Sequence, residues 1–78
     1  MRQKKPTLVI TFATTTQAMA VEKFCLSNNL PGRIIPVPRE ITAGCGLSWK
    51  AAPEDKELLE AELQKSGLGW QEMHVIEI

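Results

Sequence analysis

The chain has 78 residues, of which 44% are hydrophobic and 23% charged, and its nine basic residues balance its nine acidic ones. This length predicts a single domain over residues 1–78, without a separate catalytic domain. The hydrophobic fraction argues against intrinsic disorder. The balanced charge argues against nucleic-acid binding, because displacing counterions from phosphates requires a basic surface.

The N-terminus matches a secretory signal only in part. Basic residues precede an apolar run over residues 8–13, but this run is shorter than the roughly 7 to 15 residues of such signals, and threonines follow it. No segment approaches the ~20 apolar residues that span a bilayer. We therefore predict a cytoplasmic protein that binds no membrane and keeps its thiols reduced.

The first part of the chain predicts a strand followed by a helix. Residues 7–13 hold an apolar run rich in branched side chains, which is typical of a buried strand. Thr14 and Gln17 have the spacing of a capping box, which marks the start of a helix. Residues 16–28 then carry apolar side chains at helical spacing, so an amphipathic helix is expected there.

Residues 33–38 predict a strand at the edge of a sheet. The segment includes Pro36 and Pro38, and neither has a backbone N–H to donate to a neighbouring strand. Because the two prolines are two residues apart, both backbone nitrogens face the same side of the strand. An edge strand tolerates this when that side faces solvent, whereas a central strand does not.

The remaining elements complete a known order. Residues 47–51 alternate apolar and polar side chains and predict a strand, residues 53–66 predict a helix, and residues 70–78 predict a last strand. The order βαββαβ is that of the ferredoxin-like α+β sandwich, with a four-stranded antiparallel sheet and two helices on one face. Its strand order 4-1-3-2 places the second strand at an edge, in agreement with the two prolines.

Cys45 is the main candidate for chemistry. It lies between Gly44 and Gly46, which carry no side chains to shield it and permit backbone geometries that turn amides toward a thiolate. Arg39, in the same connection before the predicted third strand, is the candidate cation, and together with Gly44 and Gly46 it is predicted to bind around the sulfur. We expect this loop at the end of the sheet where the first helix finishes, so that Arg39 and local amides stabilise the thiolate without help from a helix N-terminus.

A structural role for Cys45 stays open at this point. If the strand extends back unbroken, Cys45, Leu47 and Trp49 share one face, and cysteine is often a small core hydrophobe. The exposure of Cys45 is therefore undecided. Cys25 lies on the apolar side of the first predicted helix, and we expect it to pack in the core and not to act as a resolving thiol.

A metal site is not expected. The two cysteines do not form a Cys-x-x-Cys motif, and His74 is the only histidine. A metal chaperone of this topology would carry such a motif after the first strand, where this chain has threonines, so we rank that function last. No cofactor is predicted.

The sequence resembles the small bacterial putative Se/S carrier-like family. The similarity lies in the Thr-rich turn and helix start over residues 14–22, in residues 36–41, and above all in Cys45-Gly46-Leu47. The resemblance implies a carrier, and not a stand-alone enzyme, in which Cys45 holds sulfur or selenium as a persulfide or selenopersulfide. It also implies a protein donor, for example of the cysteine desulfurase or selenocysteine lyase type, and a protein acceptor. Trp49 departs from the family pattern, in which a smaller residue is expected.

A second function from another class is a ligand-sensing or oligomerising module without catalysis. Ferredoxin-like domains serve many unrelated roles. This hypothesis predicts a buried, structural Cys45 and a ligand or partner at the exposed sheet face or edge. A homo-oligomer stays open, although Pro36 and Pro38 make the strand at 33–38 a poor edge for pairing. The choice between sulfur and selenium, and the identity of donor and acceptor, also stay open.

Overall fold

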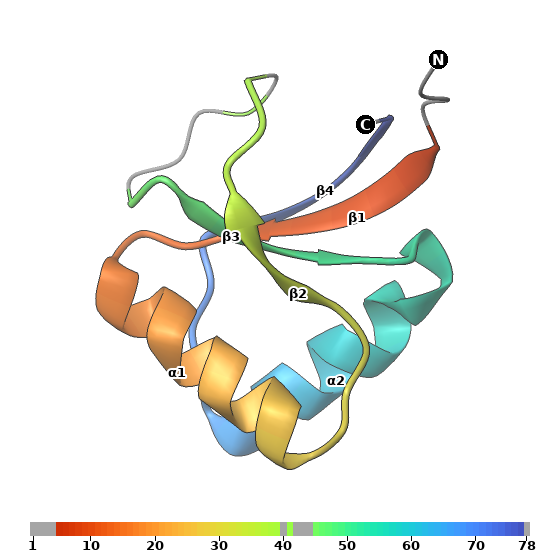
Figure 1. The fold of residues 1–78 in the computed structure, drawn as a ribbon. Helices are drawn as coiled ribbons and strands as arrows, with labels where there is room; N and C mark the ends of the chain where they lie inside the picture. The colour runs from red at the N-terminus through yellow and green to blue at the C-terminus, as the bar shows by residue number, and fades with distance from the viewer. Residues whose placement is uncertain (1–4, 40, 42–44, 78) are drawn as a thin grey trace.

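The computed structural model describes residues 5–39, 41 and 45–77, whose arrangement is shown in Figure 1. Within these residues the elements are β1 (Pro6–Thr11), α1 (Thr15–Ser27), β2 (Arg33–Pro36), β3 (Leu47–Ala51), the 3-10 helix η1 (Pro53–Asp55), α2 (Lys56–Ser66) and β4 (Glu72–Glu77). The strands form one antiparallel sheet in the order β2-β3-β1-β4. Both helices lie on the same side of the sheet (Figure 1). The predicted ferredoxin-like α+β fold is confirmed.

The Thr14 cap separates β1 from α1 as predicted, while the Gln17 side chain bonds Ala13, one residue before the position that a capping box uses. The backbone N–H of Gln17 donates to Thr14 Oγ1 over 3.1 Å, and the Gln17 side-chain oxygen accepts from the N–H of Ala13 over 2.9 Å. Because Ala13 donates to this side chain and not to a neighbouring strand, β1 ends at Thr11 and not at residue 13.

β2 lies at an edge of the sheet, and its backbone parity explains why Pro36 is tolerated there. The N–H of Val37 donates to the carbonyl of Gly46 over 3.0 Å, so these two residues form a hydrogen-bonded pair. In an antiparallel ladder such pairs alternate with pairs that exchange no hydrogen bond. The Pro36↔Leu47 pair is therefore of the second kind, and the nitrogen of Pro36 faces away from β3 toward the open side.

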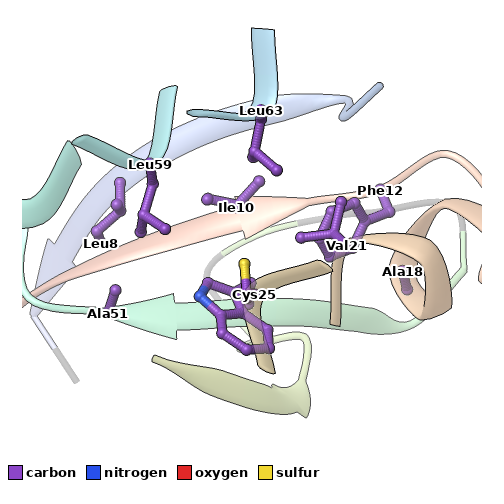
Figure 2. Packing of buried hydrophobic residues seen from close by; sticks show 10 residues of the cluster. Leu8, Ile10, Phe12, Ala18, Val21, Cys25, Ala51, Leu59 and Leu63 are labelled. Carbon is purple, nitrogen blue, oxygen red and sulfur yellow. The ribbon is translucent and has the colours of Figure 1, made fainter. Parts of the chain in front are cut away.

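The hydrophobic core lies between the sheet and the two helices. Leu8, Ile10 and Phe12 point from β1 and the residue after it toward Val21 of α1 and toward α2 (Figure 2). The complete cluster consists of Leu8, Ile10, Phe12, Ala18, Val21, Cys25, Trp49, Ala51, Leu59 and Leu63. Because side chains alternate along a strand, this packing places Val9 and Thr11 on the opposite face of the sheet.

The loop that precedes β2 packs directly over Trp49. The Trp49 side chain is fully buried, and its indole N–H donates to the carbonyl of Pro31 over 3.0 Å. Gly32 has φ +114°, and a Cβ atom built there would overlap the indole and the carbonyl of Lys50. The family pattern led us to expect a smaller residue at position 49. In this chain the Trp49 side chain is buried in the core, and Gly32 leaves room for its indole.

The face of the sheet away from the helices is not fully open. At its centre Val9, Thr11 and Ser48 are completely buried. Ile41, in the connection between β2 and β3, is only 7% exposed and does not belong to the cluster on the helix side. The chain that leaves β2 rises on this outer side (Figure 1). A ligand or partner on this face therefore has to bind away from its buried centre.

Candidate functional site

The register of the sheet places Cys45 at the end where α1 begins. Thr11, the last residue of β1, pairs with Ser48 of β3, and α1 starts at Thr15. Figure 1 shows the starts of β3 and α1 at one end of the sheet. The expectation that this loop lies where α1 finishes is therefore wrong. The reason is topological: β1 and β2 both run antiparallel to β3, so β2 ends on the same side as β1.

Cys45 is a free, partly buried cysteine at the border of the core. It packs against the helix-side cluster without belonging to it. Its Sγ accepts a hydrogen bond from the backbone N–H of Leu47 at 3.4 Å and donates one to the carbonyl of Leu47 at 3.5 Å. The side chain is thus intermediate between the shielded core cysteine and the fully open thiol that the sequence left as alternatives.

The Cys45 thiol lies where the hydrogen bonding between β1 and β3 has ended. Because Val37 and Gly46 form a hydrogen-bonded pair, the N–H and carbonyl of Leu47 point the other way, toward β1. The pairing of β1 with β3 ends at Thr11↔Ser48, one residue short of Leu47. The Cys45 sulfur interacts with both of these backbone groups. A thiolate keeps the N–H of Leu47 as a donor but can no longer donate to its carbonyl.

Gly46 sets the direction in which the chain enters β3. It has φ +78°, in the left-handed region that favours glycine, and nothing lies within 4 Å of a Cβ atom built on it. The requirement for glycine here is therefore conformational and not steric. Gly44 lies outside the described residues.

Arg39 lies in an exposed turn that is closed by a hydrogen bond of 3.0 Å from the N–H of Ile41 to the carbonyl of Pro38. Within residues 5–39, 41 and 45–77, its guanidinium forms no ion pair. Among the same residues, the hydrogen bonds of the Cys45 sulfur go to the backbone of Leu47. The sequence analysis did not identify the Leu47 backbone as the hydrogen-bond partner of the thiol. The available signal was the short separation, because Leu47 follows Cys45 by two residues.

Cys25 behaves as a core residue. It is fully buried in α1, and burial raises the pKa of its thiol from 9.0 to about 11. His74 lies on β4 with its Nε2 3.2 Å from Glu72 Oε1. The part of the chain that the structure describes holds no group of three or more histidine, cysteine or acidic residues that could bind a metal ion. Among the same residues, no helix is long and apolar enough to cross a membrane.

The buried thiol of Cys25 predicts a loss of stability at high pH. The unfolded chain ionises this thiol near pH 9, whereas the folded protein keeps its proton until about pH 11. The free energy of unfolding should therefore fall as the pH rises from 9 to 11, because ionisation favours the unfolded state. Urea denaturation at several pH values, compared with Cys25→Ala, measures this contribution. Parallel pH curves for the two proteins would contradict it.

The fold and the site together define a class: a small ferredoxin-like domain with one partly exposed cysteine just before its third strand. The family described as "Putative Se/S carrier protein-like" matches residues 7–75. The chain belongs to this family. No curated protein and no solved structure matches it significantly.

Proposed function

We propose that this protein is a cytoplasmic sulfur or selenium carrier that uses Cys45 as its acceptor and donor atom. The observation that carries the proposal is the environment of the Cys45 sulfur, which is partly exposed and has the N–H of Leu47 at 3.4 Å. That donor interacts favourably with a thiolate, which is the nucleophilic form of cysteine. Family membership over residues 7–75 supports the same role.

The transfer consists of two thiol exchanges. The Cys45 thiolate attacks the outer sulfur of a persulfide on a donor enzyme of the cysteine desulfurase type. The new sulfur–sulfur bond forms as the old one breaks, and the donor cysteine leaves as a thiolate. A thiolate of the acceptor protein then attacks the outer sulfur and releases Cys45 as a thiolate. Selenium from a donor of the selenocysteine lyase type follows the same steps, and no external oxidant or reductant is consumed.

The residues next to Cys45 have supporting roles in this proposal. Gly46 holds the left-handed turn that leads from Cys45 into the start of β3, and Gly44, the residue before Cys45 in sequence, carries no side chain that could shield the sulfur. The exposed guanidinium of Arg39 supplies a positive charge to the incoming persulfide anion. The alternative of a non-catalytic module requires a buried Cys45, and the intermediate exposure of this side chain does not favour it.

Loading with sulfur tests the proposal. After incubation with a cysteine desulfurase and cysteine, intact mass spectrometry should detect one added sulfur atom per chain. Peptide mapping should place it on Cys45. We expect Cys45→Ser to lose all loading and Cys25→Ala to keep it, because Cys25 is fully buried. In the native protein, iodoacetamide should modify Cys45 and leave Cys25 unmodified until the chain unfolds.

Loading that persists in Cys45→Ser would rule out the carrier mechanism. Modification of Cys45 only after unfolding would do the same, and would favour the non-catalytic module.

A further inference from the structure

An open groove of about 1420 Å³ runs beside β2 on the outer face of the sheet. Its lining includes every proline of the chain, namely Pro6, Pro31, Pro36, Pro38 and Pro53. Proline fixes φ and carries no backbone donor, so the walls of this groove are stiff and largely apolar. A preformed groove loses little conformational entropy when it binds a partner.

Two cations lie side by side in the lining of this groove, and neither forms a salt bridge with an acid of the described residues. Arg33 of β2 and Lys50 of β3 are direct cross-strand partners, and both line the groove. Their neighbours Ile34 and Trp49 are also partners, and Trp49 lies in the core, so alternation puts Arg33 and Lys50 on the outer face. Like charges directly opposite each other destabilise a sheet.

No ion pair relieves this repulsion within the part of the chain that the structure describes. Lys5 adds a third cation to the lining. Glu54 and Asp55 of η1 also line the groove, but neither forms a salt bridge with these cations. A carboxylate placed between Arg33 and Lys50 would remove the unfavourable interaction and form charge-assisted hydrogen bonds to both.

The size of the groove indicates what it holds. Small-molecule pockets measure roughly 300 to 1,000 Å³ and enclose most of their ligand. This groove is larger and open, and the extended stretch from Arg33 to Pro38, which begins with β2, spans roughly 17 Å at about 3.3 Å per residue. These dimensions suit an extended polypeptide segment and not a small anion.

One end of the groove lies close to the backbone of Cys45, whose side chain packs against the helix-side cluster. Pro38 lines this end, and the preceding residue, Val37, donates its N–H to the carbonyl of Gly46 over 3.0 Å. Gly46 is bonded directly to Cys45. We propose that the groove docks an acidic, extended segment of the protein that exchanges sulfur or selenium with Cys45. The identity of this partner rests on the carrier function proposed above, whereas the preference for an acidic segment rests on the groove alone.

A titration without sulfur chemistry tests the groove. Isotope-labelled Cys45→Ser protein is titrated with a short glutamate-rich peptide and with its glutamine counterpart, and backbone amides are followed by NMR. The glutamate peptide should shift Arg33, Lys50 and their neighbours and bind more weakly as salt rises. Arg33→Glu should weaken binding on the order of tenfold or more. Lys65→Glu, an exposed change in the last turn of α2 outside the groove, is the matched control and should leave binding unchanged.

Three results would overturn the docking proposal: equal binding of the glutamine peptide, equal weakening by Lys65→Glu, or shifts from inorganic phosphate that the glutamate peptide cannot displace. The last result would make the groove a small-anion site.

A second measurement separates the groove from the carrier function. With a cysteine desulfurase as donor, Arg33→Glu should slow the loading of Cys45 on the order of tenfold or more, whereas its alkylation by iodoacetamide should not change. Failure of the unsubstituted protein to load would count against the carrier, while the peptide titration would still decide the groove.

Discussion

Gly32→Ala should destabilise the protein by about 3 kcal/mol or more. A methyl group at this position overlaps the indole of Trp49 and the carbonyl of Lys50, and neither can move freely, because the indole is fully buried and the carbonyl belongs to the β3 backbone. The left-handed φ of +114° adds conformational strain for any residue with a Cβ atom. The total stability of a domain of this size is roughly 4 to 12 kcal/mol, so the variant loses a large part of it.

Gly67→Ala is the matched control for this prediction. Gly67 also has a positive φ, +76°, but nothing lies within 4 Å of a Cβ atom built there. The loss of stability in Gly67→Ala therefore reports the conformational strain alone, which is about 1 to 2 kcal/mol. Urea denaturation followed by circular dichroism gives both free energies of unfolding. Equal losses in the two variants would show that the contact between Gly32 and Trp49 is not a tight one.

Trp49→Ala should cost about 3 to 5 kcal/mol of stability. The substitution removes the largest fully buried side chain of the described residues and leaves a cavity beneath the loop before β2. It also leaves the carbonyl of Pro31 without the indole N–H that donates to it over 3.0 Å. The methyl group of Gly32→Ala would overlap the Trp49 indole. The loss of stability caused by Gly32→Ala should therefore be smaller in the Trp49→Ala background than in the unsubstituted protein.

Trp70→Ala provides the comparison. Trp70 is only half-buried and packs against the rim of the core cluster, so its removal should cost clearly less than the removal of Trp49. Chemical denaturation of the single variants and of the double variant gives the required free energies. Additive losses for Gly32→Ala and Trp49→Ala would contradict a direct contact between the two positions.

Local rules determined much of this fold from sequence. The helix cap at Thr14 depends on residues three apart and forms as predicted, and the Gln17 side chain completes it at Ala13, one residue before the expected partner. The edge position of the strand that contains Pro36 was predicted from the missing backbone N–H of proline, and the strand order confirms this position. The core position of Cys25 follows from helical periodicity. In each case the physical cause lies within one element, so no knowledge of other segments was needed.

The surroundings of Cys45 were less predictable. The sequence identified the cysteine, its family and the glycine that turns the chain at Gly46, but it left the exposure of the sulfur undecided and misplaced its loop relative to α1. The burial of Cys45 and its contacts with Leu47 depend on where β1 stops pairing with β3. That register is a relation between segments more than 30 residues apart, as the pair Thr11↔Ser48 illustrates.

Only the tertiary structure brought the prolines and cations of the groove together. Pro6 begins β1, Pro31 lies in the loop before β2 and Pro53 begins η1, yet all three line one surface. Arg33 and Lys50 become partners only through the antiparallel register of β2 and β3. Sequence patterns report which face of its own element a side chain occupies, whereas the pairing of strands decides which faces meet, because it depends on burying the whole core at once.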